Sequence, residues 1–175
     1  MRRRLACAAA VLLAGCATSQ APPRQAPARP APPARPIPGT VSAATYVAQA
    51  ASIDLFVIRS SELALVRSPS ARVRDVASRL IEAHQGTSAQ LSFAGRRLNL
   101  LPPAAMLPQQ QALYEELESS GDFDAAYVRL QRSVHGASLS LHANYARAGE
   151  SPTLRPVAAN AEAVERGHLD LLRGH

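Results

Sequence analysis

Three observations predict that the folded part of this 175-residue chain is an all-α four-helix bundle. Four long segments carry apolar residues every three or four positions, the spacing that places them on one face of a helix. Two of the connections are short, and no segment shows the alternation of a strand. The middle connection is long enough to cross the bundle, which favours a ferritin-like topology whose crossover contains a short extra helix.

The first two helices are predicted from about Ser42 to Arg67 and from about Ala71 to Ala94. Pro69 interrupts the pattern between them, and Ser70 suits the N-cap of the second helix because its hydroxyl can accept a free backbone N–H. Gly95 is expected to end the second helix. The expected apolar stripes are Val47, Ala51, Leu55, Ile58 and Leu65 on the first helix, and Val73, Val76, Ala77, Leu80, His84 and Leu91 on the second.

The second half of the chain predicts a loop over Arg96–Pro108, a short helix over Gln109–Ser119 and a third long helix over about Asp122–Ala148. A tight turn at Gly149–Pro152 then leads into a last helix over Ser151–Leu172. The expected stripes are Phe123, Tyr127, Leu130, Val134, Ala137, Leu141 and Tyr145, and then Leu154, Val157, Ala161, Val164, His168 and Leu172. Aromatic residues are few, so the core is expected to be mostly Leu, Val and Ala.

The N-terminus predicts export. Arg2, Arg3 and Arg4 precede an apolar stretch, Leu5–Ala14, which is too short to cross a hydrocarbon core that needs about 20 residues. The residues Leu-Ala-Gly-Cys that end at Cys16 resemble the bacterial lipobox, where the chain is cleaved before the cysteine and the cysteine is acylated. An ordinary secretory signal that ends at the same small residues is the alternative.

The segment after the signal predicts a tether. Residues 1–15 form the predicted lipoprotein signal peptide, 16–40 the lipidated Cys16 with a proline-rich linker, and 41–175 the bundle. Proline recurs in the linker too often for a helix and favours an extended spacer. Because Ala17 and not Asp follows Cys16, the lipobox resemblance implies an outer-membrane location that faces the periplasm.

Composition excludes some function classes. Cys7 lies within the signal and Cys16 at its end, so thiol catalysis and cysteine-based zinc sites are excluded from the mature domain. The formal charge of +6 comes from the leader and linker, which hold six of the 19 basic residues. The 13 basic residues that remain, all arginine, balance 13 acidic residues, so nucleic acid is not an expected partner.

Several segments together resemble the DUF4142 family of ferritin-like bundles. They are YVAQAASIDLFVIRSSELAL at 46–65, RVRDVASRLIEAH at 72–84, FDAAY at 123–127 followed by His135, and a last helix with His168. The resemblance implies an exported, often lipid-anchored bundle of a family whose biochemical role is not established. The chain departs from the family pattern at three positions, where Val57 replaces a glutamate, Ala83 an acidic residue and Ala163 a proline.

The predicted bundle contains one candidate metal site. Glu165 and His168 form a Glu-x-x-His pair on the last helix, and His84 and His135 lie on or near the apolar faces of two other helices. A di-iron bundle needs two such pairs and two more glutamates. The second pair is missing, and the first two helices carry no glutamate besides Glu62 and Glu82. The four residues therefore predict a mononuclear site at most.

The alternative is that His84 and His168 are core histidines, hydrogen-bonded to residues such as Asp54, Asp124 or Tyr127, because a buried imidazole needs a partner. On the sequence alone this alternative is favoured, with no catalytic residues and no cofactor expected. The favoured function is a non-enzymatic, lipid-anchored envelope protein that acts in maintenance or stress through membrane and protein contacts. A metal-binding or redox bundle, with a divalent metal as its cofactor, is the alternative function.

Overall fold

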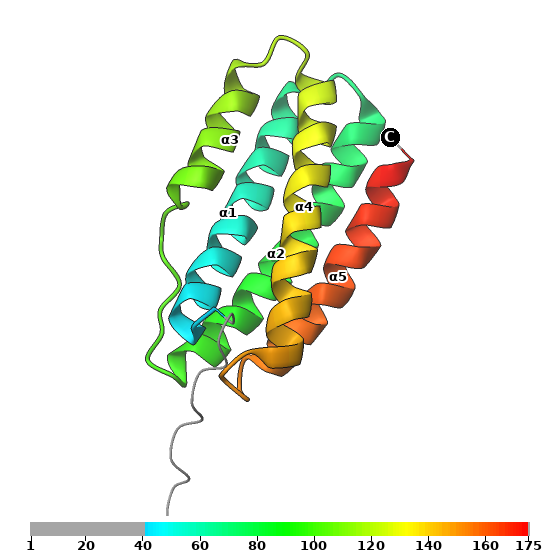
Figure 1. The fold of residues 1–175 in the computed structure, drawn as a ribbon. Helices are drawn as coiled ribbons and strands as arrows, with labels where there is room; N and C mark the ends of the chain where they lie inside the picture. The colour runs from blue at the N-terminus through cyan, green and yellow to red at the C-terminus, as the bar shows by residue number, and fades with distance from the viewer. Residues whose placement is uncertain (1–40, 175) are drawn as a thin grey trace, which may run out of the picture. The chain divides into compact units, whose positions relative to one another are not determined.

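The computed structural model describes residues 41–174, and these residues form five helices and no strand (Figure 1). The helices are α1 (Ala43–Arg67), α2 (Ala71–Arg96), α3 (Pro108–Ser119), α4 (Phe123–Ala148) and α5 (Arg155–Arg173). All five belong to one of the two units into which the chain divides, Ala34–His175. The predicted all-α class is confirmed. The predicted signal peptide, Cys16 and the proline-rich linker lie outside the described residues.

Four of the helices pack side by side, and α3 lies along their outside. Helix α1 contacts α2 and α4, helix α5 contacts α2 and α4, and α3 packs on α1 and α4. Residues 97–107 and α3 return the chain from the lower end of the bundle to its upper end, where α4 begins (Figure 1). This long segment takes the place of the predicted crossover with its extra helix. The ferritin-like assignment itself stays a prediction.

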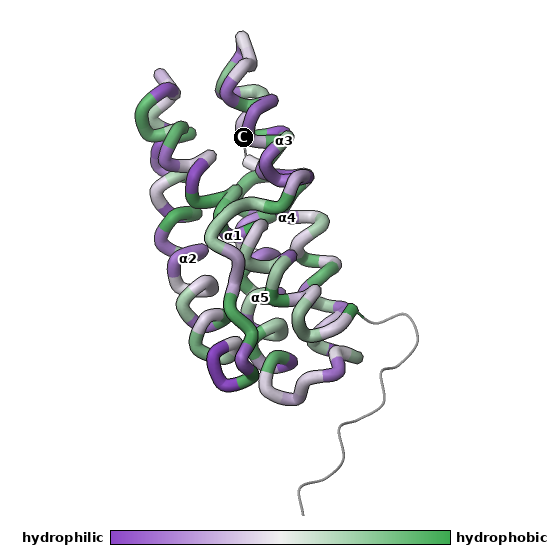
Figure 2. The backbone as a smooth tube through the Cα atoms, turned by 90° about the vertical axis from the view of Figure 1, so that its left-hand side faces the viewer, coloured by the Kyte–Doolittle hydropathy of each residue, from purple (hydrophilic) through white to green (hydrophobic). Residues whose placement is uncertain are grey.

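The helix starts follow the local chemistry of the sequence. The side chains of Ser42, Ser70 and Asp122 each accept a hydrogen bond from a backbone N–H of the first turn. Helices α3 and α5 instead carry proline in the first turn, where no N–H is needed. Hydrophobic and hydrophilic residues then alternate along every helix, as the amphipathic pattern requires (Figure 2).

Two predicted helix ends are wrong. Helix α2 continues through Gly95 to Arg96. Gly95 is instead the point where the following loop folds back and its backbone comes close to the helix. Leu100 donates its N–H to the Gly95 carbonyl over 2.9 Å. A Cβ atom at this position would meet the Leu100 carbonyl oxygen at 2.4 Å, which only glycine avoids. Helix α5 begins at Arg155, because Ser151–Leu154 form a separate turn.

The interior of the bundle has three levels. The upper cluster is apolar and consists of Ile53, Phe56, Val57, Ala64, Val73, Val76, Ala77, Leu80, Leu117, Phe123, Ala126, Tyr127, Leu130, Val134 and Leu172. The lower cluster is also apolar and consists of Tyr46, Val47, Ala50, Ala51, Leu91, Ala94, Tyr145, Leu154 and Ala158. Buried polar side chains lie where the two clusters meet on α1, α2, α4 and α5, and we call Asp54, His84, His135, His142, Glu165 and His168 the central polar layer.

The described helices contain no segment that is both long and apolar enough to span a membrane.

Candidate metal centre

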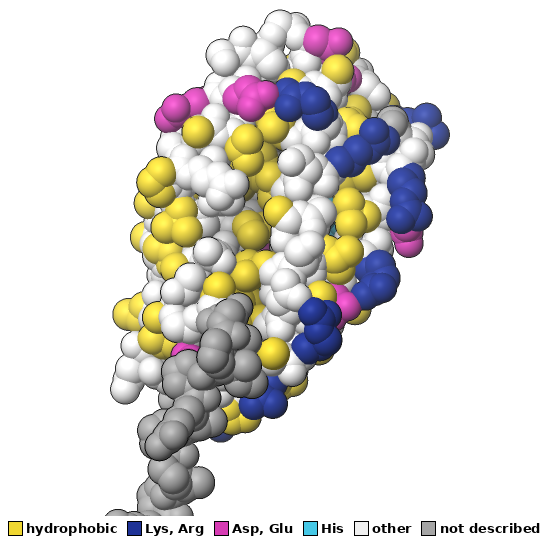
Figure 3. All heavy atoms as spheres, in the orientation of Figure 1, with side chains coloured by type: hydrophobic (Ala, Val, Ile, Leu, Met, Phe, Trp, Pro, Cys, Tyr) yellow, Lys and Arg dark blue, Asp and Glu magenta, His cyan; other side chains and the backbone are white. Residues whose placement is uncertain are grey.

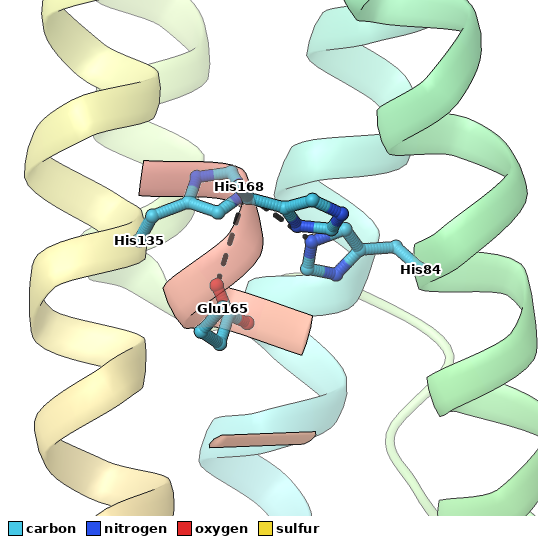
Figure 4. Close-up of side chains that lie close together, drawn as sticks. All are labelled: His84, His135, Glu165 and His168. Carbon is cyan, nitrogen blue, oxygen red and sulfur yellow. Dashed lines mark hydrogen bonds and ion pairs between the residues drawn. The ribbon is translucent and has the colours of Figure 1, made fainter. Parts of the chain in front are cut away.

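The four predicted metal ligands converge on one point inside the bundle (Figure 4). Helix α2 supplies His84, helix α4 supplies His135, and α5 supplies Glu165 and His168. One ligand atom from each residue lies within 4.8 Å of the others. All four side chains are buried, and His168 is the most exposed at 9%. The space-filling view accordingly shows almost no histidine on the face that it presents (Figure 3).

Helical spacing explains why these side chains share one level. Glu165 and His168 are three residues apart on α5, so they project from the same face. His84 follows Leu80 by four residues and continues the buried face of α2. His135 follows buried Gln131 by four residues on α4. His135, which the sequence places on or near the apolar face of its helix, is 0% exposed and so lies well inside that face.

The ring of His84 is oriented by a carboxylate. Its Nδ1 lies 2.8 Å from Asp54 Oδ1, and a carboxylate can only accept, so Nδ1 carries the hydrogen. Thr87 donates to the same oxygen over 3.0 Å and Ser88 donates to Oδ2 over 2.9 Å, which holds Asp54 in place. This arrangement leaves Nε2 of His84 directed at the centre.

The ring of His135 is oriented by a backbone carbonyl. Its Nδ1 donates to the Gln131 carbonyl oxygen over 2.7 Å, so Nε2 is the unprotonated nitrogen of the neutral ring. The Nε2 atoms of His84 and His135 are 3.4 Å apart. When both rings are neutral, two lone pairs face each other across this distance. Either a proton on His84 or a cation between the two rings removes that repulsion.

Glu165 and His168 each present a buried polar atom that has no hydrogen-bond partner. Ser138 donates to Glu165 Oε1 over 2.7 Å, whereas Oε2 accepts nothing and lies 3.8 Å from His135 Nε2. Nδ1 of His168 is also buried without a partner. Such atoms lose their hydration on folding and gain nothing in return, which costs about 1–3 kcal/mol each. A bound cation would satisfy both.

Burial keeps most of the centre uncharged. Desolvation lowers the pKa of His135 to about 3 and that of His168 to about 4, with further lowering from the nearby His84. Desolvation also raises the pKa of Glu165 to about 7. For His84, burial opposes the charged form, but the hydrogen bond and charge of Asp54 outweigh it and raise the pKa. Two of the donors, His135 and His168, are thus readily available in the unprotonated form that binds a metal, whereas His84 and Glu165 would release a proton when the ion binds.

His142 completes the layer on the side of the lower cluster. The Tyr46 hydroxyl and His142 Nδ1 form a hydrogen bond of 3.0 Å, and Nε2 of this ring lies 3.9 Å from Glu165 Oε1. Burial lowers the pKa of His142 to about 4. Neither His142 nor Tyr46 is among the site residues predicted from the sequence. The seven-residue spacing of His135 and His142 places both on the buried face of α4 and was the available signal.

The distance between two of the donors already suits a tetrahedral metal ion, and the four donor atoms, which lie within 4.8 Å of one another, would have to move closer together to share it. Metal–imidazole bonds of 2.0–2.1 Å at tetrahedral angles separate two ligand nitrogens by about 3.4 Å. The two Nε2 atoms of His84 and His135 have this separation, and His135 Nε2 and Glu165 Oε2 at 3.8 Å need a small contraction. Histidine ligands of metals usually donate their second N–H to a carboxylate or carbonyl. Asp54 and the Gln131 carbonyl occupy those positions here.

The alternative of fully satisfied core histidines applies to only part of the centre. The predicted partner Asp54 does bond His84. The other suggested partners do not serve His168, because Tyr127 pairs with Ser61 and Asp124 Oδ1 has no partner. The remaining glutamates on α1 and α2, Glu62 and Glu82, are exposed, so no bridging glutamates approach the centre from the described part of these helices.

Comparison with known proteins identifies the family. The family model for "Domain of unknown function (DUF4142)" matches residues 26–173. The chain belongs to the DUF4142 family. No curated protein matches this DUF4142 member.

Solved structures share its fold. CopM in the Cu(II)-bound form superimposes with a TM-score of 0.65 at 12% identity, over 77% of this chain and 95% of that one. The Ag-bound form of CopM gives 0.63 at 13% identity, over the same shares of the two chains. A DUF305 fragment from Deinococcus radiodurans gives 0.66 at 16% identity, over 79% and 97%. At these identities the likeness concerns the helical fold alone.

Proposed function

We propose that this DUF4142 protein is a metal-binding helical bundle that holds one transition-metal ion between α2, α4 and α5. The observation that carries the proposal is the convergence of four buried donors, two of which, Glu165 and His168, each have a buried polar atom without a hydrogen-bond partner. On the sequence alone, a role through protein or surface contacts is favoured. Metal binding moves ahead of it because His168 Nδ1 and Glu165 Oε2 lack the hydrogen bonds that a purely structural core would supply.

The chemistry of the donors indicates which ions fit. Three imidazoles and one carboxylate suit zinc, copper, iron and nickel, whereas calcium and magnesium prefer sites made only of oxygen. CopM, which shares the fold, has solved structures with copper and with silver bound. This likeness supports the view that such a bundle accommodates a transition metal.

The number of donors favours a non-catalytic role. Structural zinc sites have four protein ligands, whereas catalytic sites keep one position open for water or substrate. His84, His135, Glu165 and His168 together would supply all four ligands of a tetrahedral shell. We therefore propose that the protein stores, buffers or is stabilised by its ion, and does not use it in catalysis.

We further propose that the bundle works at the envelope. The basic n-region, the short apolar stretch and the lipobox support acylation at Cys16, and Ala17 supports the periplasmic face of the outer membrane. The linker would hold the bundle away from the lipid surface. A Cys16→Ala variant is expected to leave the membrane fraction for the soluble periplasmic fraction. Continued membrane partition of this variant would refute lipidation at that residue.

Elemental analysis of the purified domain, without a histidine tag, tests the metal proposal. We expect about one transition-metal ion per chain after incubation with excess ion and gel filtration, because one set of four donors is present. A His84→Ala/His168→Ala double variant is expected to lose the ion. The matched control is Glu162→Ala/Asp170→Ala, which removes two acidic side chains of α5 outside the centre. Metal-free wild-type protein, unchanged in stability by added ions, would overturn the proposal.

A further inference from the structure

We infer that the centre selects a divalent ion over a monovalent one, through two buried carboxylates of which only one is a ligand. This inference rests on the proposed function and names the charge class of its ion. Glu165 is the carboxylate ligand, and Asp54 is the carboxylate that acts through His84.

The buried charges of the central polar layer favour a divalent ion. Asp54 and Glu165 are the acidic residues that are buried among residues 41–174, and no arginine is buried there. With neutral imidazoles, a divalent ion and these two carboxylates together have no net charge. A monovalent ion balances only one of the two carboxylates. It therefore leaves either a negative charge in a region shielded from water or a proton on Glu165 or His84, and the protonated group is then lost as a ligand. Because an unpaired buried charge is strongly unfavourable, the layer favours the divalent ion.

Asp54 is positioned to act at a distance. It is 4% exposed, and its Oδ1 lies 2.8 Å from His84 Nδ1, so its charge reaches the ion through the imidazole. Thr87 and Ser88 satisfy its remaining acceptor positions without adding a positive charge. The negative charge of Asp54 is therefore left to be balanced by a proton on His84 or by the ion.

The chemistry of the donor atoms also favours a divalent ion. Monovalent copper and silver prefer soft sulfur ligands. The described residues contain no cysteine, and their one methionine, Met106, packs against the upper cluster and not at the centre. CopM has solved structures with Cu(I) and with silver bound, so the fold does not by itself exclude such ions. The selectivity belongs to the donors of this chain.

A competition between Zn²⁺ and Ag⁺ in chloride-free buffer tests the inference, since neither ion changes oxidation state during the measurement. The centre of the wild-type protein is expected to retain Zn²⁺ when the two ions are supplied at equal concentration. The bound ions are counted by elemental analysis after gel filtration. Replacement of Zn²⁺ by Ag⁺ would overturn the inference, while the proposed function would stand.

Asp54→Asn tests the mechanism, because asparagine keeps the side-chain shape and can still accept from His84. Loss of such a second partner weakens metal binding by about 10–100-fold. Coulomb energy is proportional to the charge of the ion, so a loss of about 100-fold for Zn²⁺ corresponds to a loss of about 10-fold for Ag⁺. The Zn²⁺/Ag⁺ preference is expected to fall about 10-fold.

A control variant and two contrary outcomes distinguish this inference from its alternatives. Asp75→Asn removes the same charge from an exposed position on α2, and its preference should equal that of the wild type. If Asp54 only oriented the His84 ring, both ions would lose the same factor and the preference would not change, which would refute the role of its charge. If the wild type binds neither ion, the proposed function fails together with this inference.

Discussion

The central polar layer and the upper cluster lie in the same helices, but they differ in what they need to be stable. The upper cluster is held mainly by apolar contacts, and residues such as Phe56 and Leu80 are 0% exposed. In the layer, by contrast, Glu165 Oε2 and His168 Nδ1 are buried without hydrogen bonds. The cluster therefore stabilises the fold unconditionally, whereas the layer contributes fully only when something cationic occupies its centre.

This difference indicates that the apolar clusters stabilise the fold, whereas the central polar layer between them holds the candidate site. Buried polar groups that lack partners are uncommon in folded proteins and ask for an explanation. Apolar clusters above and below the layer hold the four helices at a fixed distance without help from the centre. This allows the ligand side chains to stay arranged for an ion that has yet to bind.

The largest effect is expected from a cavity in the upper cluster. Phe56→Ala should lower the free energy of unfolding by about 3–5 kcal/mol, because the large side chain is completely buried. The loss should be the same with and without Zn²⁺, measured by urea denaturation. Phe93→Ala, at a position that is 62% exposed, is the matched control and should change stability by less than about 0.5 kcal/mol. Rescue of Phe56→Ala by metal would contradict the division between the two levels.

A somewhat smaller effect is expected from the ion itself. Zn²⁺ at about 100 times its dissociation constant should raise the free energy of unfolding by about 2.7 kcal/mol, if it binds only the folded state. His168→Ala should abolish this gain, and in the metal-free state it should cost only the packing of the buried ring, because Nδ1 has no hydrogen bond to lose. Asp170→Asn, two residues away and exposed, should keep the full gain. An equal gain in His168→Ala would show that the ion binds elsewhere.

Acid is expected to weaken the metal-free layer. The pKa values of His135, His142 and His168 are lowered by burial to about 3, 4 and 4, so below pH 6.5 the unfolded state binds more protons at these residues. Their contribution to stability is present above pH 6.5 and is lost as the pH falls. Glu165, with its pKa raised to about 7, acts in the opposite direction between pH 4.5 and 7.

Three histidines outweigh one glutamate, so the net free energy of unfolding should fall from pH 6.5 to pH 4. Denaturation in the presence of a chelator measures this slope. Replacement of His135 and His142 by glutamine, which does not titrate, should flatten the slope in this range. A slope of opposite sign in the wild-type protein would mean that Glu165 dominates the layer.

The sequence predicted helix positions well where local chemistry decides them. Ser70 and Asp122 cap their helices, and every residue of the predicted α2 stripe is buried. It predicted the α1 stripe less well, because Leu65 is 41% exposed whereas Phe56 and Val57 are fully buried. Helix α1 packs against three others, α2, α3 and α4, and so buries more than one stripe. Which faces are covered depends on neighbours that a single helical pattern does not reveal.

The candidate site was predictable as a set of residues but not as a geometry. His84, His135, Glu165 and His168 could be selected because apolar spacing assigns each to an inner face. Which ring nitrogen faces the centre depends on the relative height of the helices, since Asp54 on α1 orients His84 on α2. The role of Ser138 could not be predicted for the same reason, because its hydroxyl reaches Glu165 only when α4 and α5 pack at a particular relative height.

The smallest predicted effect concerns this hydroxyl and separates support of the ligand from support of the fold. Ser138→Ala removes the 2.7 Å hydrogen bond to Glu165 Oε1 and should weaken Zn²⁺ binding about 10-fold, at the lower end of the range for second partners. Titration calorimetry measures the change. Ser140→Ala on the same helix removes an exposed hydroxyl that donates only to the Gly136 carbonyl of α4. The Zn²⁺ affinity of this variant should equal that of the wild type. Equal affinities in both variants would mean that His142 or the ion alone orients Glu165. A 10-fold loss in Ser138→Ala would instead show that the bundle positions its carboxylate before the ion arrives.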